Sequence, residues 1–368
     1  MEYILIEECC DILDSRRIPI TASDRMSGPY PYYGANGVQD YVADYIFDDE
    51  LVLLAEDGGN FGSKTRPIAY RVSGKCWVNN HAHVLKPMAS MDVDYLCYSL
   101  MFYDTGELVN GATRQKLTQT AMRKMLIPQR SLQEQKRIVC ELSKVQSIIS
   151  ARQQQLQKLD ELVKARFVEL FGDTILNPFG WKKDLLGTVC DVRDGTHDSP
   201  QYYESGYPLV TSKNVTGGKI DLTDCSLICE ADFKKINERS KVDIGDIIMP
   251  MIGTVGKPVI VDIEPNFAIK NVSLIKFKAD SRVLNIYIRA LLQSDYFDDA
   301  VLSKVRGGTQ KFISLGDIRK LEVLVPPMEL QEQFATFIKQ TDKSKLAIQQ
   351  SLDKLETLKR SLMQKYFE

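Results

Sequence analysis

The sequence predicts an α+β protein, built from two copies of one module that are related by a pseudo-twofold internal repeat. In each copy, a globular domain of mixed helices and strands precedes one long helix, and the two long helices pair. Three observations support this prediction: short segments recur in the same order in both halves, two long segments lack Pro and Gly, and strand-like apolar runs fill much of the remainder of the 368 residues.

The most exact repeated segment is "LQEQ", which stands at Leu132–Gln135 and again at Leu330–Gln333, 198 residues later. Each copy follows a Pro-containing turn and opens a run of helix formers. Other pairs keep the same order: "CDILDSRRIP" and "CDVRDGTHDSP", "LVLLAEDGGNFG" and "DIIMPMIGTVG", "NNHAHVLK" and "KNVSLIKF", and "GATRQKL" and "GGTQKFI". Each pair is weak alone, but their shared order predicts a duplicated module.

Both globular parts mix strand and helix patterns. Runs such as "YIFDDELVLLAE" and "VSLIKFKA" are rich in β-branched and aromatic residues, which favours strands. The segments "VDYLCYSLMFY" and "LNIYIRALLQSDYF" carry apolar residues at helical spacing. Gly, Pro and Asn separate these segments, as expected of turns.

The two long helices are predicted by a seven-residue repeat. Apolar positions alternate by four and three along each helix, with a few polar interruptions. The first stripe is Ile138, Leu142, Val145, Ile149, Arg152, Leu156, Leu159, Val163, Arg166 and Leu170. The second is Phe334, Ile338, Thr341, Lys345, Ile348, Leu352, Leu355, Lys359, Leu362 and Tyr366.

Neither stripe can remain in water, because each would expose a row of large apolar side chains. The simplest arrangement pairs the two helices with each other, and a pseudo-twofold relation between the halves makes that pair antiparallel. The alternative is that each helix pairs with another chain.

Composition excludes several classes of protein. A formal net charge of −2 argues against a uniformly basic surface, although local basic patches remain compatible with it. The acidic N-terminus "MEYILIEECCDIL" does not resemble a secretory signal, and no apolar run is long enough for a membrane span. The eight cysteines lack a C-x-x-C pair, which is typical of reduced thiols in the cytoplasm.

No cofactor and no metal are expected. The segments "GGNFGSKT" and "GTVGKP" only partly match a nucleotide-binding loop. His81 and His83 would share one face of a strand and could hold a metal, but His197 is the only further histidine. A structural or nucleic-acid-facing role is the preferred interpretation of this pair.

These segments together resemble the specificity subunit of type I restriction-modification systems. "IPQRSLQEQKRI" and "VPPMELQEQFAT" are similar to the helix starts of that family. "DGTHDSP" with "PLVTSKNVTGGKI", and "YPYYGANGVQDYV" with "VNNHAHVL", resemble two common types of its target recognition domain. The resemblance covers essentially the whole chain. It implies target recognition domains at 1–128 and 173–323, and coiled-coil helices at 129–172 and 324–368.

The resemblance also implies a function. Such a subunit performs no catalysis: each recognition domain binds one half of a bipartite site in double-stranded DNA, and the coiled coil sets the spacing. Two methyltransferase (M) subunits and further restriction (R) subunits join it, and the complex carries adenine methyltransferase and endonuclease activity. We expect the helix ends and outer faces to dock these subunits. Four residues of the repeated motif are expected to serve folding or assembly: Glu134, Gln135, Glu332 and Gln333.

The DNA-contacting residues are expected in Gly-rich polar loops, whose side chains suit base edges and phosphates. In the first domain they are Asn60, Ser63, Lys64, Arg66, Asn80, His81, Thr113, Arg114, Gln115 and Lys116. In the second they are Thr196, His197, Ser212, Lys213, Asn214, Thr254, Lys257, Arg306, Gly308, Thr309, Gln310 and Lys311.

Two other functions are weighed against this one. A coiled-coil adaptor would use its two similar domains to bind proteins. A single-chain methyltransferase or nuclease would need a cofactor motif or a carboxylate–lysine cluster, and the sequence contains neither. Salt-dependent binding to mixed-sequence duplex distinguishes the first two classes.

Overall fold

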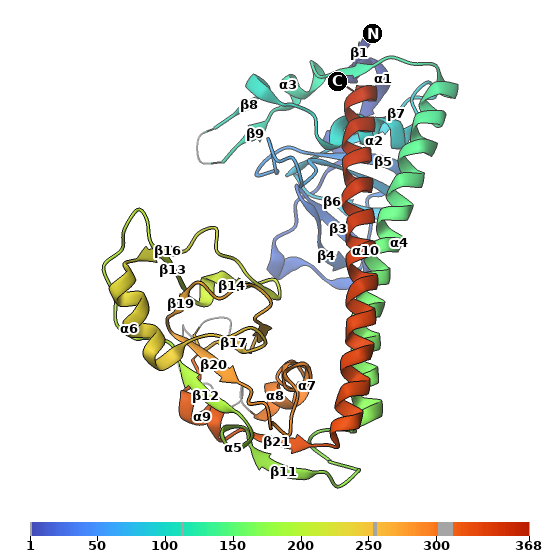
Figure 1. Cartoon of the computed structure of the whole chain (residues 1–368). Helices are drawn as coiled ribbons and strands as arrows, with labels where there is room; N and C mark the ends of the chain where they lie inside the picture. The colour runs from blue at the N-terminus through green and yellow to red at the C-terminus, as the bar shows by residue number, and fades with distance from the viewer. Residues whose placement is uncertain (1, 112–113, 253–255, 301–311, 368) are drawn as a thin grey trace. The chain divides into compact units, whose positions relative to one another are not determined.

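The computed structural model describes residues 2–111, 114–252, 256–300 and 312–367. The chain forms two compact units, one of residues 1–154 and 349–368 and the other of residues 155–348. Each unit combines a mixed α/β domain with one half of each long helix, so the predicted α+β class is confirmed (Figure 1).

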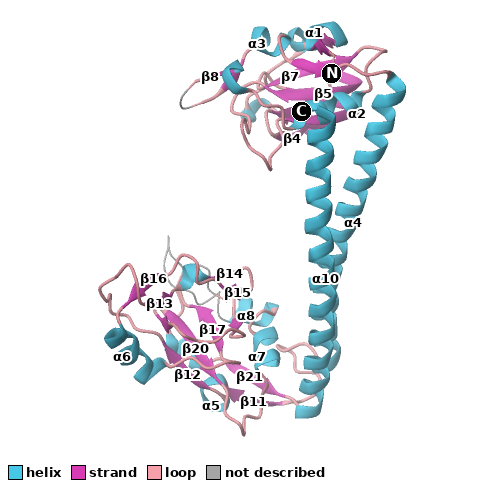
Figure 2. Cartoon of the chain, turned by 45° about the horizontal axis from the view of Figure 1, so that its top comes forward, coloured by secondary structure: helices cyan, strands magenta, loops and turns pink. Residues whose placement is uncertain are grey.

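The first unit is organised around a six-stranded sheet of order β2-β7-β5-β6-β3-β4. The strands of this sheet are magenta in Figure 2. Its strands are β1 (Tyr3–Leu5), β2 (Cys10–Ile12), β3 (Ser27–Gly34), β4 (Gly37–Val42), β5 (Phe47–Ala55), β6 (Ala69–Val78), β7 (Ala82–Pro87), β8 (Val109–Asn110), β9 (Lys116–Leu117) and β10 (Leu126–Pro128). Its short helices are α1 (Ile6–Cys9), α2 (Val93–Met101) and α3 (Gln119–Arg123).

Strand β5 explains why this sheet is stable. Its residues from Leu51 to Ala55 are all fully buried, because alternate side chains face opposite sides of the sheet and both sides are covered. Val52 and Leu54 pack in the core that includes α2, whereas Leu51 and Leu53 pack in a second core on the other face. The strand that the apolar run predicts here is therefore confirmed.

The second unit contains a four-stranded sheet of order β12-β20-β17-β18 and a three-stranded sheet of order β16-β13-β19. Its strands are β11 (Lys182–Leu185), β12 (Asp191–Asp194), β13 (Tyr207–Val210), β14 (Val215–Thr216), β15 (Lys219–Ile220), β16 (Ser226–Ile228), β17 (Ile247–Pro250), β18 (Val259–Ile260), β19 (Ala268–Ile269), β20 (Val272–Lys276) and β21 (Glu322–Val325). Its short helices are α5 (Leu186–Val189), α6 (Glu230–Ser240), α7 (Asn285–Leu291), α8 (Asp295–Ala300) and α9 (Leu315–Arg319).

The internal repeat is visible in strand pairing. Strands β2, β7 and β5 pair antiparallel in that order, and β12, β20 and β17 do the same. A small outer pair accompanies each set, β1 with β10 and β11 with β21. Even the caps recur: Thr118 caps α3 and Ser314 caps α9, each through its hydroxyl. The duplication predicted from the sequence therefore holds for the fold.

The long helices α4 (Leu132–Phe171) and α10 (Met328–Phe367) lie side by side (Figures 1 and 2). Every position of both predicted stripes is buried or half-buried. In the first unit, Lys359 Nζ donates to Gln146 Oε1 at 2.8 Å. The Tyr366 hydroxyl, farther along α10, donates to Glu141, which lies earlier on α4. Rising residue numbers on α4 thus meet falling numbers on α10, and the predicted antiparallel pairing is confirmed there.

The same polarity holds in the second unit. Lys345 forms an ion pair with Asp160, and the rings of Phe167 and Phe334 lie 5.6 Å apart between centroids. Phe171 completes this aromatic cluster, with its ring 4.7 Å from that of Tyr287 on α7. The helix pair and the second domain therefore share one core.

The two "LQEQ" segments do not occupy equivalent places in the helices. The first forms residues one to four of α4, whereas Met328 and Glu329 precede the second within α10. The predicted equivalence is therefore wrong by two residues. The reason is local: Ser131 caps α4 in a capping box with Glu134, whereas α10 starts directly after Pro327.

Replacing Phe171 by Ala should lower the free energy of unfolding of the second unit by about 3–5 kcal/mol, because a fully buried ring leaves a cavity. Trp181 donates its indole N–H to the Phe171 carbonyl and reports on this region by fluorescence. Urea unfolding in a Trp77→Phe background measures the effect. The control Val168→Ala, at an exposed position, should change the value by less than about 0.5 kcal/mol; similar losses in both variants would contradict this account of the core.

Candidate nucleic-acid interface

Four loops of the first domain meet at one end of its strands. They are the β3–β4 turn, the segment after β5, the β6–β7 turn and the β8–β9 hairpin. Asn36 donates to the Gly58 carbonyl, and Asn60 donates to Asn36, both at 3.0 Å. The Gly58 N–H donates to the Gln115 carbonyl at 3.0 Å. The fold therefore brings together several of the predicted DNA-contacting residues that are far apart in sequence.

A cluster of charged side chains stands on these loops. Asp57 accepts from Arg114 Nε at 2.6 Å and lies 3.4 Å from His81 Nδ1. Lys116 Nζ lies 3.2 Å from the carboxylate of Glu56. The Arg114 side chain is 61% exposed although Asp57 holds it at one edge. A guanidinium held in this way loses less conformational freedom when it meets a base edge or a phosphate.

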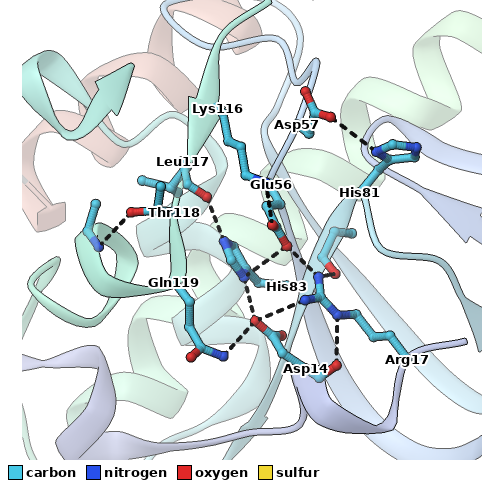
Figure 3. A network of polar contacts seen from close by, with 12 residues as sticks. Asp14, Arg17, Glu56, Asp57, His81, His83, Lys116, Leu117, Thr118 and Gln119 are labelled. Carbon is cyan, nitrogen blue, oxygen red and sulfur yellow. Dashed lines mark hydrogen bonds and ion pairs between the residues drawn. The ribbon is translucent and has the colours of Figure 1, made fainter. Parts of the chain in front are cut away.

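A buried polar network supports this cluster from below (Figure 3). The Asp14 carboxylate contacts His83 Nδ1 at 2.6 Å, and His83 Nε2 contacts the Leu117 carbonyl at 2.9 Å. Arg17 donates to Glu56 at 2.5 Å. Burial acts to raise the pKa of Asp14, but the hydrogen bond and charge of His83, with help from Arg17, hold that pKa below its ordinary value. These contacts hold the turn that follows β2 against β7 and β9.

The network does not fit a metal ion. The ligand atoms of Asp14, Glu56 and His83 lie within 4.8 Å of one another. Both ring nitrogens of His83 already face oxygen atoms, and the Arg17 guanidinium bonds to Glu56 and lies 3.5 Å from Asp14. A cation there would have to displace that guanidinium. The two neighbouring histidines lie in different surroundings: His83 is fully buried, whereas the side chain of His81 is 35% exposed.

The other predicted residues of the first domain lie on the same loops. Lys64, Arg66 and Asn80 are exposed. Ser63 is half-buried, and its hydroxyl accepts from the Arg66 N–H at 2.9 Å, so it shapes the loop. Thr113 lies outside the described residues.

In the second domain, a histidine occupies the corresponding end of the sheet. His197 Nε2 lies 2.8 Å from Asp194, and His197 Nδ1 lies 2.8 Å from the Asn271 side-chain oxygen. The side chain of His197 is 60% exposed. The hydrogen bond to Asn271 and then that to Asp194 raise the pKa of His197. Arg239 also contacts Asp194, so one carboxylate contacts both of these basic side chains.

The remaining predicted residues of the second domain differ in exposure. Lys213 and Lys257 are exposed, and Ser212 is half-buried. Thr196 forms a bridge with Lys270 and accepts from the Asp198 N–H. Asn214 is buried, and its side-chain oxygen accepts from the Thr211 N–H at 3.0 Å, which makes it a turn cap. The others lie outside the described residues: Thr254, Arg306, Gly308, Thr309, Gln310 and Lys311.

Sequence reasoning missed the carboxylates that hold these cations. Asp57 and Asp194 are the main examples, with Asn271 as a neutral partner. A signal existed for one of them, because Asp14 and Asp194 fall at the same place in the repeated "CDILD" and "CDVRD" segments.

Comparison with known proteins identifies a family model and relatives that match nearly the whole chain. The model of the type I restriction modification DNA specificity domain matches the chain twice, at residues 1–161 and 178–360. A putative type I restriction enzyme specificity subunit of Haemophilus influenzae is 28% identical over 98% of this chain and 89% of the relative. The MjaVIII specificity subunit of Methanocaldococcus jannaschii is 22% identical over 98% of this chain and 91% of the relative.

Solved structures agree on the fold. The crystal structure of a type I restriction-modification S subunit from M. genitalium gives a TM-score of 0.60 at 15% identity, over 100% of this chain and 96% of the other. A chain from a structure of the type I system that addresses complex assembly gives a TM-score of 0.57 at 17% identity, over 100% and 97%. At such identities the likeness establishes the shared fold.

The pKa of His197 should lie above the ordinary value of about 6.5. Since folding raises it, the stability contributed by the protonated ring is fully present below about pH 6.5 and is lost as pH rises through the raised value. An Asn271→Gly variant keeps the left-handed backbone and removes one acceptor, so its His197 pKa should fall. NMR titration suits a chain with only three histidines; identical His197 pKa values in both proteins would show that the Asn271 contact does not raise the pKa of the ring.

Proposed function

Because the chain belongs to the family of type I restriction-modification DNA specificity subunits, we propose that each of its globular domains binds one half of a split duplex sequence. The paired helices α4 and α10 set the distance between the two halves. The observation that carries this proposal is the double match of the specificity domain, one match over each half of the chain.

The loop chemistry supports binding to duplex DNA. Arg114, Lys116 and His81 stand together on the first domain, and His197 with Arg239 stands on the second. Arginine and lysine suit base edges and phosphates, and a protonated histidine adds a further cation. Since the two loop sets differ in sequence, the two half-sites differ as well, and the full site is asymmetric.

The proposed division of the chain follows the repeat. Residues 1–128 and 173–323 form the target recognition domains, and residues 129–172 and 324–368 form the helical spacer. A helix of 40 residues is about 60 Å long. This length exceeds one turn of duplex DNA, about 34 Å, so the pair is long enough to separate two half-sites.

The chain itself is non-catalytic in this proposal. Two M subunits dock on it and supply adenine methylation, and R subunits join that core to supply cleavage. The complex acts in the cytoplasm. Among the described residues, no helix has the length and apolarity to cross a bilayer.

The outer faces of the long helices offer docking positions for the M subunits. Leu162 on α4 is 49% exposed and Leu358 on α10 is 47% exposed. They lie 196 residues apart, the same offset as the two heptad stripes, so they occupy equivalent places in the repeat. Two equivalent apolar positions match two copies of one partner.

Replacing Arg114 by Ala should weaken binding to the cognate duplex by about 1–3 kcal/mol, because the exposed guanidinium is a base or phosphate ligand. The control Arg123→Ala removes another partly exposed, ion-paired arginine of the same domain and should leave binding unchanged. Fluorescence anisotropy with the chain and its M partner, at several salt concentrations, measures both. Equal affinity for duplexes of different sequence, together with an affinity that does not fall as the salt concentration rises, would contradict the proposed function.

Changing Leu162 to Asp should remove one of two bound M subunits, and Leu358→Asp should remove the other, because a charge replaces an apolar contact at each site. Native mass spectrometry counts the subunits. Each variant should give one M subunit and the double variant none. Lys354→Ala, at an exposed position of α10, serves as the control and should retain two. Two M subunits on the double variant would exclude these positions as the docking sites.

A further inference from the structure

Each long helix carries one buried glutamine at its fourth residue. Gln135 is the fourth residue of α4 and is 1% exposed. Gln331 is the fourth residue of α10 and is fully buried. The two are 196 residues apart, so they are equivalent in the repeat. The repeated motif itself hides this equivalence, because Gln135 is the second glutamine of the first "LQEQ" and Gln331 is the first glutamine of the second.

The two amides make the same three hydrogen bonds. Gln135 Nε2 donates to the carbonyls of Ser90 and Arg130, each at 3.0 Å, and Gln135 Oε1 accepts from the Asp92 N–H at 2.7 Å. Both N–H groups and one oxygen lone pair of the side chain are therefore engaged.

In the second unit, Gln331 repeats this pattern. Its Nε2 donates to the carbonyls of Arg282 at 3.0 Å and Pro326 at 2.9 Å, and its Oε1 accepts from the Leu284 N–H at 2.8 Å. The two patterns also agree in position: the carbonyls of Arg130 and Pro326 each belong to the residue five places before the glutamine.

These bonds join the long helix to the globular domain. Asp92 is the N-cap residue of α2 and Leu284 is the N-cap residue of α7, and both short helices pack in the domain cores. A buried tyrosine of each short helix also bonds to the strand that precedes the long helix: the Tyr95 hydroxyl donates to the Pro128 carbonyl of β10, and the Tyr287 hydroxyl donates to the Leu324 carbonyl of β21, both at 3.0 Å. Apolar packing alone would let the long helix slide against its domain. A buried polar group with all its hydrogen bonds made specifies one arrangement of the two.

We propose that Gln135 and Gln331 are positioning residues for DNA specificity, and this inference rests on the proposed function. Each amide fixes the angle between one recognition domain and its long helix. Adding one base pair to duplex DNA moves a half-site along the axis and rotates it by about one tenth of a turn. Two domains held at fixed angles therefore accept one spacer length, and loosening either angle broadens the accepted range.

The test uses the full chain with its M partner and the duplex that the wild-type complex selects from a random pool. Matched duplexes lengthen or shorten the spacer by one base pair. The variants are Gln135→Met and Gln331→Met, which keep side-chain length and lose the hydrogen bonds. The controls are Gln133→Met on α4 and Gln340→Met on α10, which change one exposed glutamine of each long helix.

We expect the wild type and both controls to prefer the selected spacer by at least about tenfold. In each buried-site variant this preference should shrink severalfold, while discrimination against mutated half-site bases stays at the wild-type level. A role in stability alone would lower the unfolding midpoint and leave the spacer preference unchanged, and that result would overturn the inference.

Two further outcomes separate the possible failures. If the wild type shows no preference for a split site, the proposed function fails. If Gln135→Met does not fold, Gln331→Met carries the same test in the second unit, where the same three hydrogen bonds are lost. Unfolding of both variants would identify the two glutamines as stability residues and would also overturn the inference.

Discussion

The whole molecule depends on the burial of two long apolar stripes. Helices α4 and α10 each contain 40 residues, and each stripe carries mostly large apolar side chains that water would destabilise. The chain satisfies both stripes by pairing them antiparallel, and the ends of the pair extend into the domain cores through Tyr366 in one unit and Phe167 in the other. In each unit, the helix pair and the domain therefore share one core.

The proposed binding of DNA by a chain of net charge −2 depends on local groups of basic side chains. Basic side chains of the loops lie against carboxylates: Asp57 forms an ion pair with Arg114, and Asp194 contacts both His197 and Arg239. These carboxylates order the basic groups, which stay exposed. The electrostatic contribution to binding then depends on local arrangement, and net charge is a poor guide to it.

Much of the fold could be predicted, because helix stripes, apolar strands and ordered repeats are properties of local sequence. The stripes at Ile138 and Phe334 already carried the correct 196-residue offset, whereas the more visible "LQEQ" match misplaced the equivalence by two residues. An identical four-residue motif does not show where a helix begins, whereas the capping residue does. The candidate site was harder to predict from the sequence than the fold. Polar loops suggested Arg114 and His197, but only the folded chain brings Asp57 to Arg114 and Asn271 to His197. Local sequence also does not show that the Asn214 side chain caps its own turn, or that the sheet buries His83 against Asp14.

Cross-linking tests the antiparallel pairing within one chain most directly. Cysteines replace Gln146 and Lys359, whose side chains are hydrogen-bonded, in a background where the more accessible Cys140, Cys225 and Cys229 are serine. A short bis-maleimide should then link residues 146 and 359 within the monomer, as peptide mass spectrometry would identify. The comparison pair is 146 and 342, which are equivalent in the repeat and would be adjacent only in a parallel arrangement. Efficient linkage of that pair, or linkage of 146 to 359 only between two chains, would contradict the account.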